Sequence, residues 1–254
     1  MVRLGQNFLA DPNLLDAIVR DAELRPDDVA LEVGAGEGVL SERLADAAAH
    51  LHSVELDRSL AEALESLASR PNVSLHWADA MQIDFGALRP VPTVVVSNLP
   101  YAVATPVILR TIEQLPSLRS WTVMVQREIA DRLRAAPGSR IYGSPSVLAQ
   151  LACEVRLLRK VDPAVFRPRP RVDSAILALR RTGPGADTET RELVRAAFAH
   201  RRKALARSVE HARPGSLAVV RTALEQLDLP ADARAEALSP DDFAALSAKL
   251  RRSD

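Results

Sequence analysis

The chain has little of what disulfide-bonded and membrane-spanning proteins depend on. Cys153 is its single cysteine, which excludes an internal disulfide. No apolar run approaches the roughly 18 residues that a membrane-spanning helix needs. The first residues also lack the long apolar centre of a secretory signal peptide. We therefore expect a cytoplasmic protein that makes no membrane contact.

Metal-ligand patterns are equally sparse. No pair of cysteines or histidines has the spacing of a metal site. His50 and His52 would point to the same side of a strand, but the sequence offers them no further partner nearby. The sequence therefore predicts that the protein holds no metal.

Net charge is absent too, because 33 Lys and Arg residues balance 33 Asp and Glu residues. The balance hides an asymmetry: residues 1–100 hold 7 basic and 16 acidic side chains, whereas residues 101–254 hold 26 and 17. This distribution suggests that a polyanion approaches the second half of the chain, although a solvated basic face gives the same pattern. With 254 residues and 47% hydrophobic content, the chain can bury one large core and a smaller appendage.

Strand and helix patterns alternate over the first two thirds of the chain, which predicts an α/β fold with a mostly parallel sheet. The expected strands are 29–33, 51–54, 73–77, 94–97, 121–126, 155–161 and 174–179. The expected helices are 11–24, 39–45, 59–67, 106–115, 128–133 and 147–153. Residues 182–188, T-G-P-G-A-D-T, are the best linker candidate, and the pattern beyond them is helical throughout. We expect one domain at 1–182 and a small all-α domain at 189–254.

The most informative stretch is V-V-V-S-N-L-P-Y at 94–101, which indicates a buried strand that breaks into a rigid loop. Open α/β sheets bind their ligands at such carboxyl ends. Asn98 offers a side-chain carbonyl, Leu99 a backbone carbonyl and Tyr101 a flat ring, while Pro100 shapes the turn without adding a donor. Two acceptors and a ring face suit an aromatic primary amine. The alternative is that Asn98 caps the next helix and Tyr101 packs in the core.

A glycine turn, Gly34 to Gly38, joins an expected strand to an expected helix, and Glu55 follows about 20 residues on, where it can accept from ribose hydroxyls. A nicotinamide dinucleotide is one possible ligand, but its motif needs glycine where Val39 stands, and its pyrophosphate would face Glu37. S-adenosylmethionine fits better, because its cationic sulfonium and amino groups tolerate nearby acids. Asp79 would accept from the adenine amine, or is an aspartate of a surface turn.

Two basic segments are candidates for contact with phosphates. In the first, Phe166 begins a run in which prolines exclude regular strand pairing and hold an extended path. Phe166 either fills the core or forms the second wall of a base pocket, with the neighbouring arginines on phosphates. The second is H-R-R-K at 200–203, which is either a solvated helix face or a source of salt-sensitive affinity for nucleic acid. The candidate phosphate-binding residues are Arg167, Arg169, Arg171, Arg201, Arg202 and Lys203.

In this order the segments resemble the ribosomal RNA adenine dimethyltransferases, and within that family the bacterial small-subunit branch. The resemblance is carried by G-Q-N-F-L at 5–9, E-V-G-A-G-E-G at 32–38, V-E-L-D at 54–57, D-A at 79–80, N-L-P-Y at 98–101, the run 126–143, F-R-P-R-P-R-V-D-S at 166–174 and H-R-R-K at 200–203. It covers nearly the whole chain. The resemblance implies a Rossmann-like class I S-adenosylmethionine methyltransferase domain followed by a helical domain that binds RNA or the ribosome.

The resemblance also implies residue roles. S-adenosylmethionine, released as S-adenosylhomocysteine, would contact Asn7, Leu9, Gly34, Gly36, Glu55, Asp79 and Asn98. The catalytic set would be Asn98, Leu99, Pro100, Tyr101 and Phe166.

The implied substrate is a pair of adjacent adenines near the 3′ end of small-subunit (16S) rRNA in a 30S precursor. Each exocyclic amine would be methylated twice by a monomeric enzyme that acts in ribosome biogenesis. One alternative is a related methylase of large-subunit (23S) rRNA that confers macrolide-type resistance. The other is an assembly factor that kept the fold and lost catalysis.

Overall fold

The computed structural model describes residues 8–252. They divide into two compact units, one made of residues 8–130 and 155–181 and the other of residues 131–154 and 182–252. The chain crosses between the units three times, and the last crossing, between residues 181 and 182, lies at the end of the first domain expected from the sequence. The two earlier crossings have no counterpart in the expected division, because residues 131–154 belong to the helical unit.

The side chains of residues 131–154 explain this difference. Tyr142 is fully buried, and its hydroxyl donates to the Leu238 carbonyl at 2.9 Å. Its ring meets the Phe198 ring edge-on, with 5.9 Å between the centroids. Helical periodicity identifies a buried face but does not say which core that face joins. The segment is therefore assigned by contacts that are distant in sequence.

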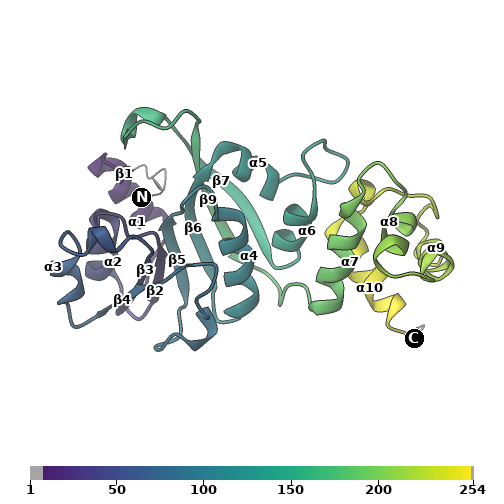
Figure 1. The fold of residues 1–254 in the computed structure, drawn as a ribbon, viewed down its shortest axis with the longest axis horizontal. Coiled ribbons are helices and arrows are strands. Elements are labelled where there is room, and N and C mark those ends of the chain that lie inside the picture. Colours follow the sequence, from purple (N-terminus) through teal and green to yellow (C-terminus); the bar gives the residue numbers. More distant parts are fainter. Residues whose placement is uncertain (1–7, 253–254) are drawn as a thin grey trace. The chain divides into compact units, whose positions relative to one another are not determined.

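Seven strands form the sheet of the first unit, in the order β4-β3-β2-β5-β6-β9-β7 (Figure 1). They are β2 (Val29–Val33), β3 (His50–Glu55), β4 (Val73–Trp77), β5 (Val94–Asn98), β6 (Ser120–Gln126), β7 (Cys153–Val161) and β9 (Ser174–Arg181). Strands β2 to β6 run parallel, and β9 is antiparallel to β6. The predicted α/β fold with a mostly parallel sheet is confirmed. Because β3 and β5 lie on opposite sides of β2, the carboxyl ends of β2 and β5 flank a topological switch point.

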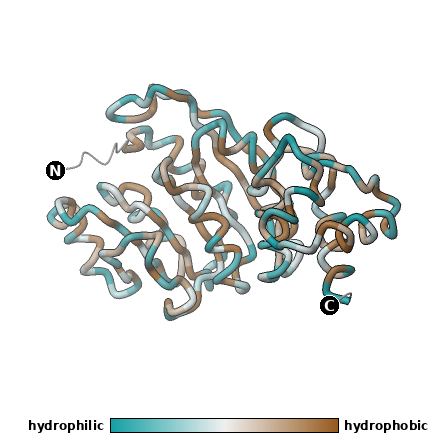
Figure 2. The backbone as a smooth tube through the Cα atoms, turned by 45° about the vertical axis from the view of Figure 1, so that its right-hand side comes forward, coloured by the Kyte–Doolittle hydropathy of each residue, from teal (hydrophilic) through white to brown (hydrophobic). Residues whose placement is uncertain are grey.

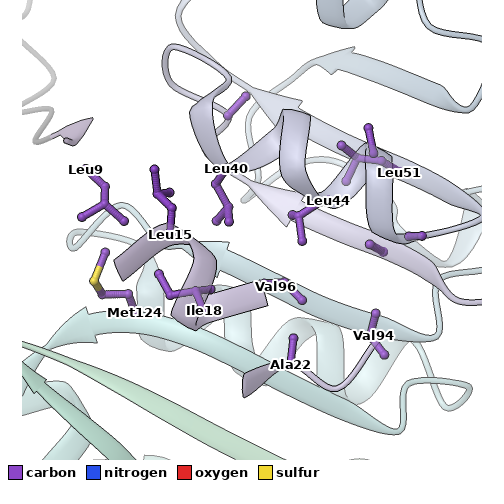
Figure 3. Close-up of a cluster of buried hydrophobic side chains, with 14 of the residues drawn as sticks. Leu9, Leu15, Ile18, Ala22, Leu40, Leu44, Leu51, Val94, Val96 and Met124 are labelled. Carbon is purple, nitrogen blue, oxygen red and sulfur yellow. The ribbon is translucent and has the colours of Figure 1, made fainter. Parts of the chain in front are cut away.

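Helices cover both faces of this sheet. On one face, side chains of α1 (Pro12–Asp21) and α2 (Val39–Ala47) share a hydrophobic cluster with Val96 and Met124 (Figure 3). Successive strand residues point to opposite faces, so Trp121 lies on the other side of the sheet. There its Nε1 donates to Thr111 of α4 (Ala104–Gln114) at 2.9 Å. The sheet is thus buried on both faces, as its apolar strands predict.

Local signals set the helix ends. The Asp11 carboxylate accepts from the backbone N–H groups of Asn13 and Leu14 and so caps α1. The helix expected at 59–67 is broken, because Asp57 starts a short 3-10 turn, η1 (Arg58–Leu60), and α3 covers only Glu65–Ala68. Two further 3-10 turns are η2 (Phe85–Ala87) and η3 (Pro163–Val165).

The proline-rich connection before β9 does form strand pairing. Strand β8 (Phe166–Arg167) pairs antiparallel with β1 (Phe8–Leu9), and the Ala10 N–H donates to the Val165 carbonyl at 2.9 Å. The expectation that the prolines exclude a ladder here is wrong. The paired residues lie between Pro163 and Pro168, so their own N–H groups remain available for pairing.

The second unit is helical. Its helices are the end of α5 (Arg127–Leu133), α6 (Ser144–Gln150), α7 (Thr188–Ala199), α8 (Leu205–Ala212), α9 (Leu217–Glu225), the 3-10 turn η4 (Ala235–Ala237) and α10 (Pro240–Leu250). Hydrophilic and hydrophobic residues are interspersed along these segments (Figure 2), as expected for amphipathic helices. Phe198 and Phe243 stack in its core with their ring centroids 5.8 Å apart. Within residues 8–252, every helix is too short or too polar to cross a bilayer.

His50, His52 and His76 lie together on the paired strands β3 and β4, with the His50 and His52 ring centroids 4.7 Å apart. His52 Nδ1 lies 3.0 Å from His76 Nε2, and His52 Nε2 lies 2.8 Å from the Pro90 carbonyl oxygen. Strand pairing therefore brings His52 a partner that the sequence did not reveal. Burial lowers the pKa of His52 to about 4 and also lowers the pKa of His76. In the described part of the chain, no cluster of histidine, cysteine or acidic residues could hold a metal ion.

Candidate active site

A cavity of about 580 Å³ lies in the first unit at the carboxyl ends of the parallel strands. Its volume is that of a small-molecule site. The predicted site residues that line it are Leu9, Gly34, Gly36, Glu55, Asp79, Asn98, Leu99, Pro100 and Tyr101. Asn7 lies outside the described residues. Four strand ends and the β1 segment therefore meet at one cavity, as the sequence predicts for the strands.

The glycine turn after β2 brings the backbone against the loop after β5. Gly34 has a φ of +87°, and a Cβ placed on it would lie 3.1 Å from the Cδ and Cγ atoms of Pro100. The Gly34 N–H donates to the Val54 carbonyl at 2.7 Å. Only glycine combines this left-handed conformation with so close an approach. The turn therefore fixes the spacing between the two loops on either side of the switch point.

Glu55 is held in place by backbone donors. Its Oε1 accepts from the N–H groups of Leu56 and Asp57, both at 2.8 Å, and its Oε2 accepts from the Gly36 N–H at 2.9 Å. A carboxylate offers about four acceptor directions, so capacity remains for one more donor. The carboxylate thus ties β3 to the glycine turn and can still accept from a ligand hydroxyl.

Glu32 is a buried acid on the cavity wall. Its Oε2 accepts from the hydroxyls of Ser41 and Ser53, and the residue is 1% exposed. Burial raises the pKa of Glu32 to about 8; the two serines oppose this shift and the nearby Glu55 adds to it. Much of the Glu32 population is therefore protonated at neutral pH in the absence of a cationic ligand.

The raised pKa of Glu32 gives a testable dependence of stability on pH. The folded protein binds this proton more tightly than the unfolded chain, so the contribution of Glu32 to stability falls as the pH rises from about 4.5 to about 8. Glu32→Gln keeps an acceptor for both serines and removes the titration. We expect the variant to gain on the order of 1–3 kcal/mol relative to the parent between pH 5 and pH 9.

Urea unfolding at several pH values measures this difference. Glu42→Gln is the matched control, because Glu42 lies on α2 and is exposed. The control should keep the pH slope of the parent protein. A Glu32→Gln variant with that same slope would contradict the assignment.

Asn98 ends β5 opposite Met124 and is half-buried at the cavity. The residue that precedes α4 is Val103, so the alternative that Asn98 caps this helix is wrong. Among residues 8–252, no group forms a hydrogen bond with the Asn98 side-chain amide. The next residue, Leu99, donates its N–H to the Met124 carbonyl at 3.0 Å and buries its side chain, so it can act on a ligand only through its backbone.

The Tyr101 ring lines the cavity, and its hydroxyl lies 2.6 Å from the Ser174 hydroxyl. Burial raises the pKa of Tyr101, against the opposing effect of the Ser174 hydrogen bond, so the phenol is neutral at physiological pH. Ser174 begins β9 directly opposite Gln126, which also lines the cavity. Sequence reasoning missed both as site residues, although each stands at a strand end.

Loss of the Ser174 hydroxyl should leave Tyr101 less well oriented. A single hydrogen bond contributes about 0.5–1.5 kcal/mol, so we expect Ser174→Ala to lower kcat/KM for the reaction at this site by roughly two- to twelvefold. Tyr101→Phe should lose as much, and the double variant should lose no more than either single variant. Ser247→Ala removes a buried serine hydrogen bond in the second unit, to Thr190 at 2.9 Å, and should leave kcat/KM unchanged. Additive losses in the double variant would count against this coupling.

The sequence left two alternatives for Asp79, a carboxylate that faces the ligand or the aspartate of a turn, and the structure combines them. Its Oδ1 accepts from the Met81 N–H at 2.8 Å, and its Oδ2 lies 3.3 Å from Gln82 Nε2, as in a turn. The residue is half-buried and lines the cavity. The turn therefore presents the Asp79 carboxylate to the cavity.

Phe166 does not contribute to the cavity lining within residues 8–252. It is 2% exposed and belongs to the hydrophobic cluster that also contains Leu9, its partner across the β1–β8 pair. The structure therefore places Phe166 in the core, which is one of the two alternatives that the sequence left open.

The six candidate phosphate-binding residues are exposed. In the first unit, Arg167, Arg169 and Arg171 alternate with prolines, and Arg169 forms an ion pair of 3.7 Å with Asp162. In the second unit, Arg201 donates to the Arg140 carbonyl at 2.9 Å, and Lys203 Nζ lies 2.5 Å from His211 Nε2. The three arginines and the H-R-R-K segment are thus accessible to a ligand, each on its own unit.

A doubly wound sheet with a glycine turn and a ring of acids at its switch point defines a class I S-adenosylmethionine-dependent methyltransferase. The structure is similar to a dimethyladenosine transferase from Plasmodium falciparum, with a TM-score of 0.80 and 24% identity over 96% of this chain and 98% of that one. It is also similar to the 23S rRNA methyltransferase ErmE, with a TM-score of 0.69 and 28% identity over 96% of this chain and 100% of that one.

The chain belongs to the ribosomal RNA adenine dimethylase family, whose model matches residues 2–251. It is 44% identical to ribosomal RNA small subunit methyltransferase A of Rubrobacter xylanophilus over 98% of this chain and 94% of that protein. It is 43% identical to the protein of the same name from Streptomyces griseus over 96% of this chain and 87% of that protein. The family expected from the sequence is confirmed.

Proposed function

We propose that the protein transfers methyl groups from S-adenosylmethionine to the exocyclic amines of two adjacent adenines near the 3′ end of small-subunit rRNA, within a 30S precursor. One observation carries the proposal: a single cavity joins the glycine turn, Glu55 and Asp79 to the Asn98–Tyr101 loop. The names of the relatives at 43–44% identity support the small subunit as the target. The enzyme would act as a monomer in the cytoplasm.

The cavity residues suit this methyl donor. Gly34 and Gly36 let the backbone approach a ligand closely, and the acids of the wall favour a cation over a phosphate. Glu55 would accept from the ribose hydroxyls and Asp79 from the adenine amine, with Leu9 closing over the ligand. When bound, S-adenosylmethionine supplies an electrophilic methyl group on a sulfonium.

Asn98 and Leu99 would activate the acceptor by position. An adenine amine is a weak nucleophile because its lone pair is delocalised into the ring. The Asn98 side-chain carbonyl and the Leu99 backbone carbonyl would accept its two N–H bonds, which favours a pyramidal nitrogen with its lone pair directed at the methyl group. After the transfer the methylated nitrogen carries a positive charge and releases one proton to solvent, so no titrating base is obligatory at this site.

The base would have to leave its stack to reach the cavity, and Tyr101 offers the surface on which it would stack. Pro100 keeps the loop in the shape that places Leu99 and Tyr101 together. Phe166 would have to leave its packing position before it could contact a base, so its role as the second wall stays a prediction. The exposed residues of the two basic segments would bind RNA phosphates.

Methyl incorporation tests the proposed function. The purified protein, labelled S-adenosylmethionine and 30S particles that lack the modification should give methylated adenines at two adjacent positions. Large-subunit RNA is the necessary second substrate, because the similarity to ErmE favours a large-subunit methylase as the alternative. Label in large-subunit RNA alone would establish that alternative. No label in either substrate, with retained binding to 30S particles, would establish a non-catalytic assembly factor.

A further inference from the structure

Two side chains of α4 hold the loop that follows β4. Arg110 Nη1 donates to the Ala80 carbonyl at 2.5 Å, and its Nη2 donates to the Ile83 carbonyl at 2.8 Å. One turn further along the helix, Gln114 Oε1 accepts from the Phe85 N–H at 3.1 Å. The Arg110 guanidinium also lies over the Phe85 ring, 5.3 Å from its centroid. The loop from residue 80 to residue 85 is therefore fixed to one face of α4.

The tethered loop is part of the cavity. Asp79 and Ala80 both line it, and the N–H groups of Gln82 and Ile83 donate to the Asp79 carbonyl at 2.9 Å. The carbonyl that Arg110 Nη1 binds is thus adjacent to the residue proposed to contact adenine. A shift of the Ala80–Ile83 turn would move the Asp79 carboxylate with it.

The other end of α4 adjoins the Asn98–Tyr101 loop. The helix begins at Ala104, three residues after Tyr101, and continues without interruption to Gln114. It therefore connects the loop that carries Asn98 to the turn that carries Asp79. A guanidinium suits this position because its two Nη groups reach two carbonyls in a fixed fork, which a lysine ammonium does not reproduce.

We propose that Arg110 is a positioning residue of this methyltransferase: through α4 it sets the place of the Asp79 turn relative to the Asn98–Tyr101 loop. The proposal rests on the proposed function, because Asp79 is taken to contact the adenine of the methyl donor. Arg110 touches neither the donor nor the base, and it acts through Asp79.

The first test compares Arg110→Gln with Arg89→Gln. Arg89 is the matched control, because it donates to the Gly86 and Leu88 carbonyls at 2.8 and 2.7 Å, just beyond the Asp79 turn. We expect Arg110→Gln to weaken S-adenosylhomocysteine binding about tenfold and to raise the KM for S-adenosylmethionine equally, with kcat at saturating donor within about twofold of the parent. Arg89→Gln should change neither, and Arg110→Lys should recover part of the affinity. Unchanged affinity in Arg110→Gln would overturn the proposal.

A double-mutant cycle separates positioning from a general effect on stability. If Arg110 acts through Asp79, then adding Arg110→Gln to Asp79→Ala should weaken S-adenosylhomocysteine binding by less than twofold further. Independent, multiplicative losses would refute the coupling even if each variant alone binds poorly. The parent protein separates failure of the proposed function from failure of the role of Arg110. If it fails to bind S-adenosylhomocysteine, the proposed function fails; if it binds and the cycle is additive, only the role of Arg110 fails.

Discussion

Asn98→Ala is expected to lower kcat for methyl transfer by roughly 10²–10³-fold while the affinity for S-adenosylhomocysteine stays within about threefold of the parent. The loss is large because the Asn98 amide is the only side-chain acceptor that the Asn98–Leu99 pair offers to the adenine amine. The cofactor keeps its contacts with the glycine turn, Glu55 and Asp79. Single-turnover methylation of 30S particles measures the rate, and calorimetry measures the affinity.

Asn72→Ala is the matched control for this variant. The Asn72 amide donates to the Ala45 carbonyl at 2.7 Å, just before β4 begins and away from the carboxyl ends of the strands. The control loses a partly buried amide contact and should keep its methylation rate. Turnover at the parental rate in Asn98→Ala would remove Asn98 from the mechanism. An equal fall of rate in both variants would point to a loss of folding.

The second large effect is expected for Gly34→Ala. A left-handed backbone at an alanine costs about 1–2 kcal/mol, and the new methyl group would lie 3.1 Å from the Pro100 ring. Either the glycine turn or the Asn98–Tyr101 loop must therefore move, and both line the cavity. We expect more than a tenfold loss of S-adenosylhomocysteine affinity, together with a lower Tm.

Gly138→Ala separates the conformational cost of the left-handed backbone from the effect of the contact with Pro100. Gly138 has a φ of +80°, and a Cβ placed on it meets no atom within 4 Å. The control therefore carries the same conformational cost without the contact. It should lower Tm to a similar degree and leave affinity unchanged. Equal affinity of Gly138→Ala and Gly34→Ala for S-adenosylhomocysteine would show that the contact with Pro100 does not affect binding.

Much of the cavity could be predicted because its residues stand at strand ends. Parallel strands place their carboxyl ends at one edge of the sheet, so Gly34, Glu55, Asp79 and Asn98 were expected together from their local patterns alone. In the glycine turn and in the N-L-P-Y loop, the residue types themselves indicate how each segment would contact a ligand. Neither depends on a contact with a distant segment for its recognition.

The parts that were missed depend on such contacts. Ser174 joins the site because β9 pairs with β6, and Arg110 reaches its loop because α4 packs beside it. Neither relation leaves a periodic signal in the sequence. The Phe166 segment was expected to remain unpaired because prolines flank it, yet β1 supplies a partner from the other end of the first unit. Strand pairing decides the positions of Ser174 and Phe166, and the packing of α4 decides that of Arg110.

The short ladder between β1 and β8 has a thermodynamic consequence. It links Leu9, which lines the cavity, to Arg167, which is exposed at the start of the arginine run. Because backbone pairing joins the two strands, a ligand that holds one strand in place also favours the paired position of the other. A ligand that orders one strand therefore raises the affinity of any ligand that orders the other, by the same factor in both directions. Methyl donor and RNA are then expected to bind cooperatively, although no residue need touch both.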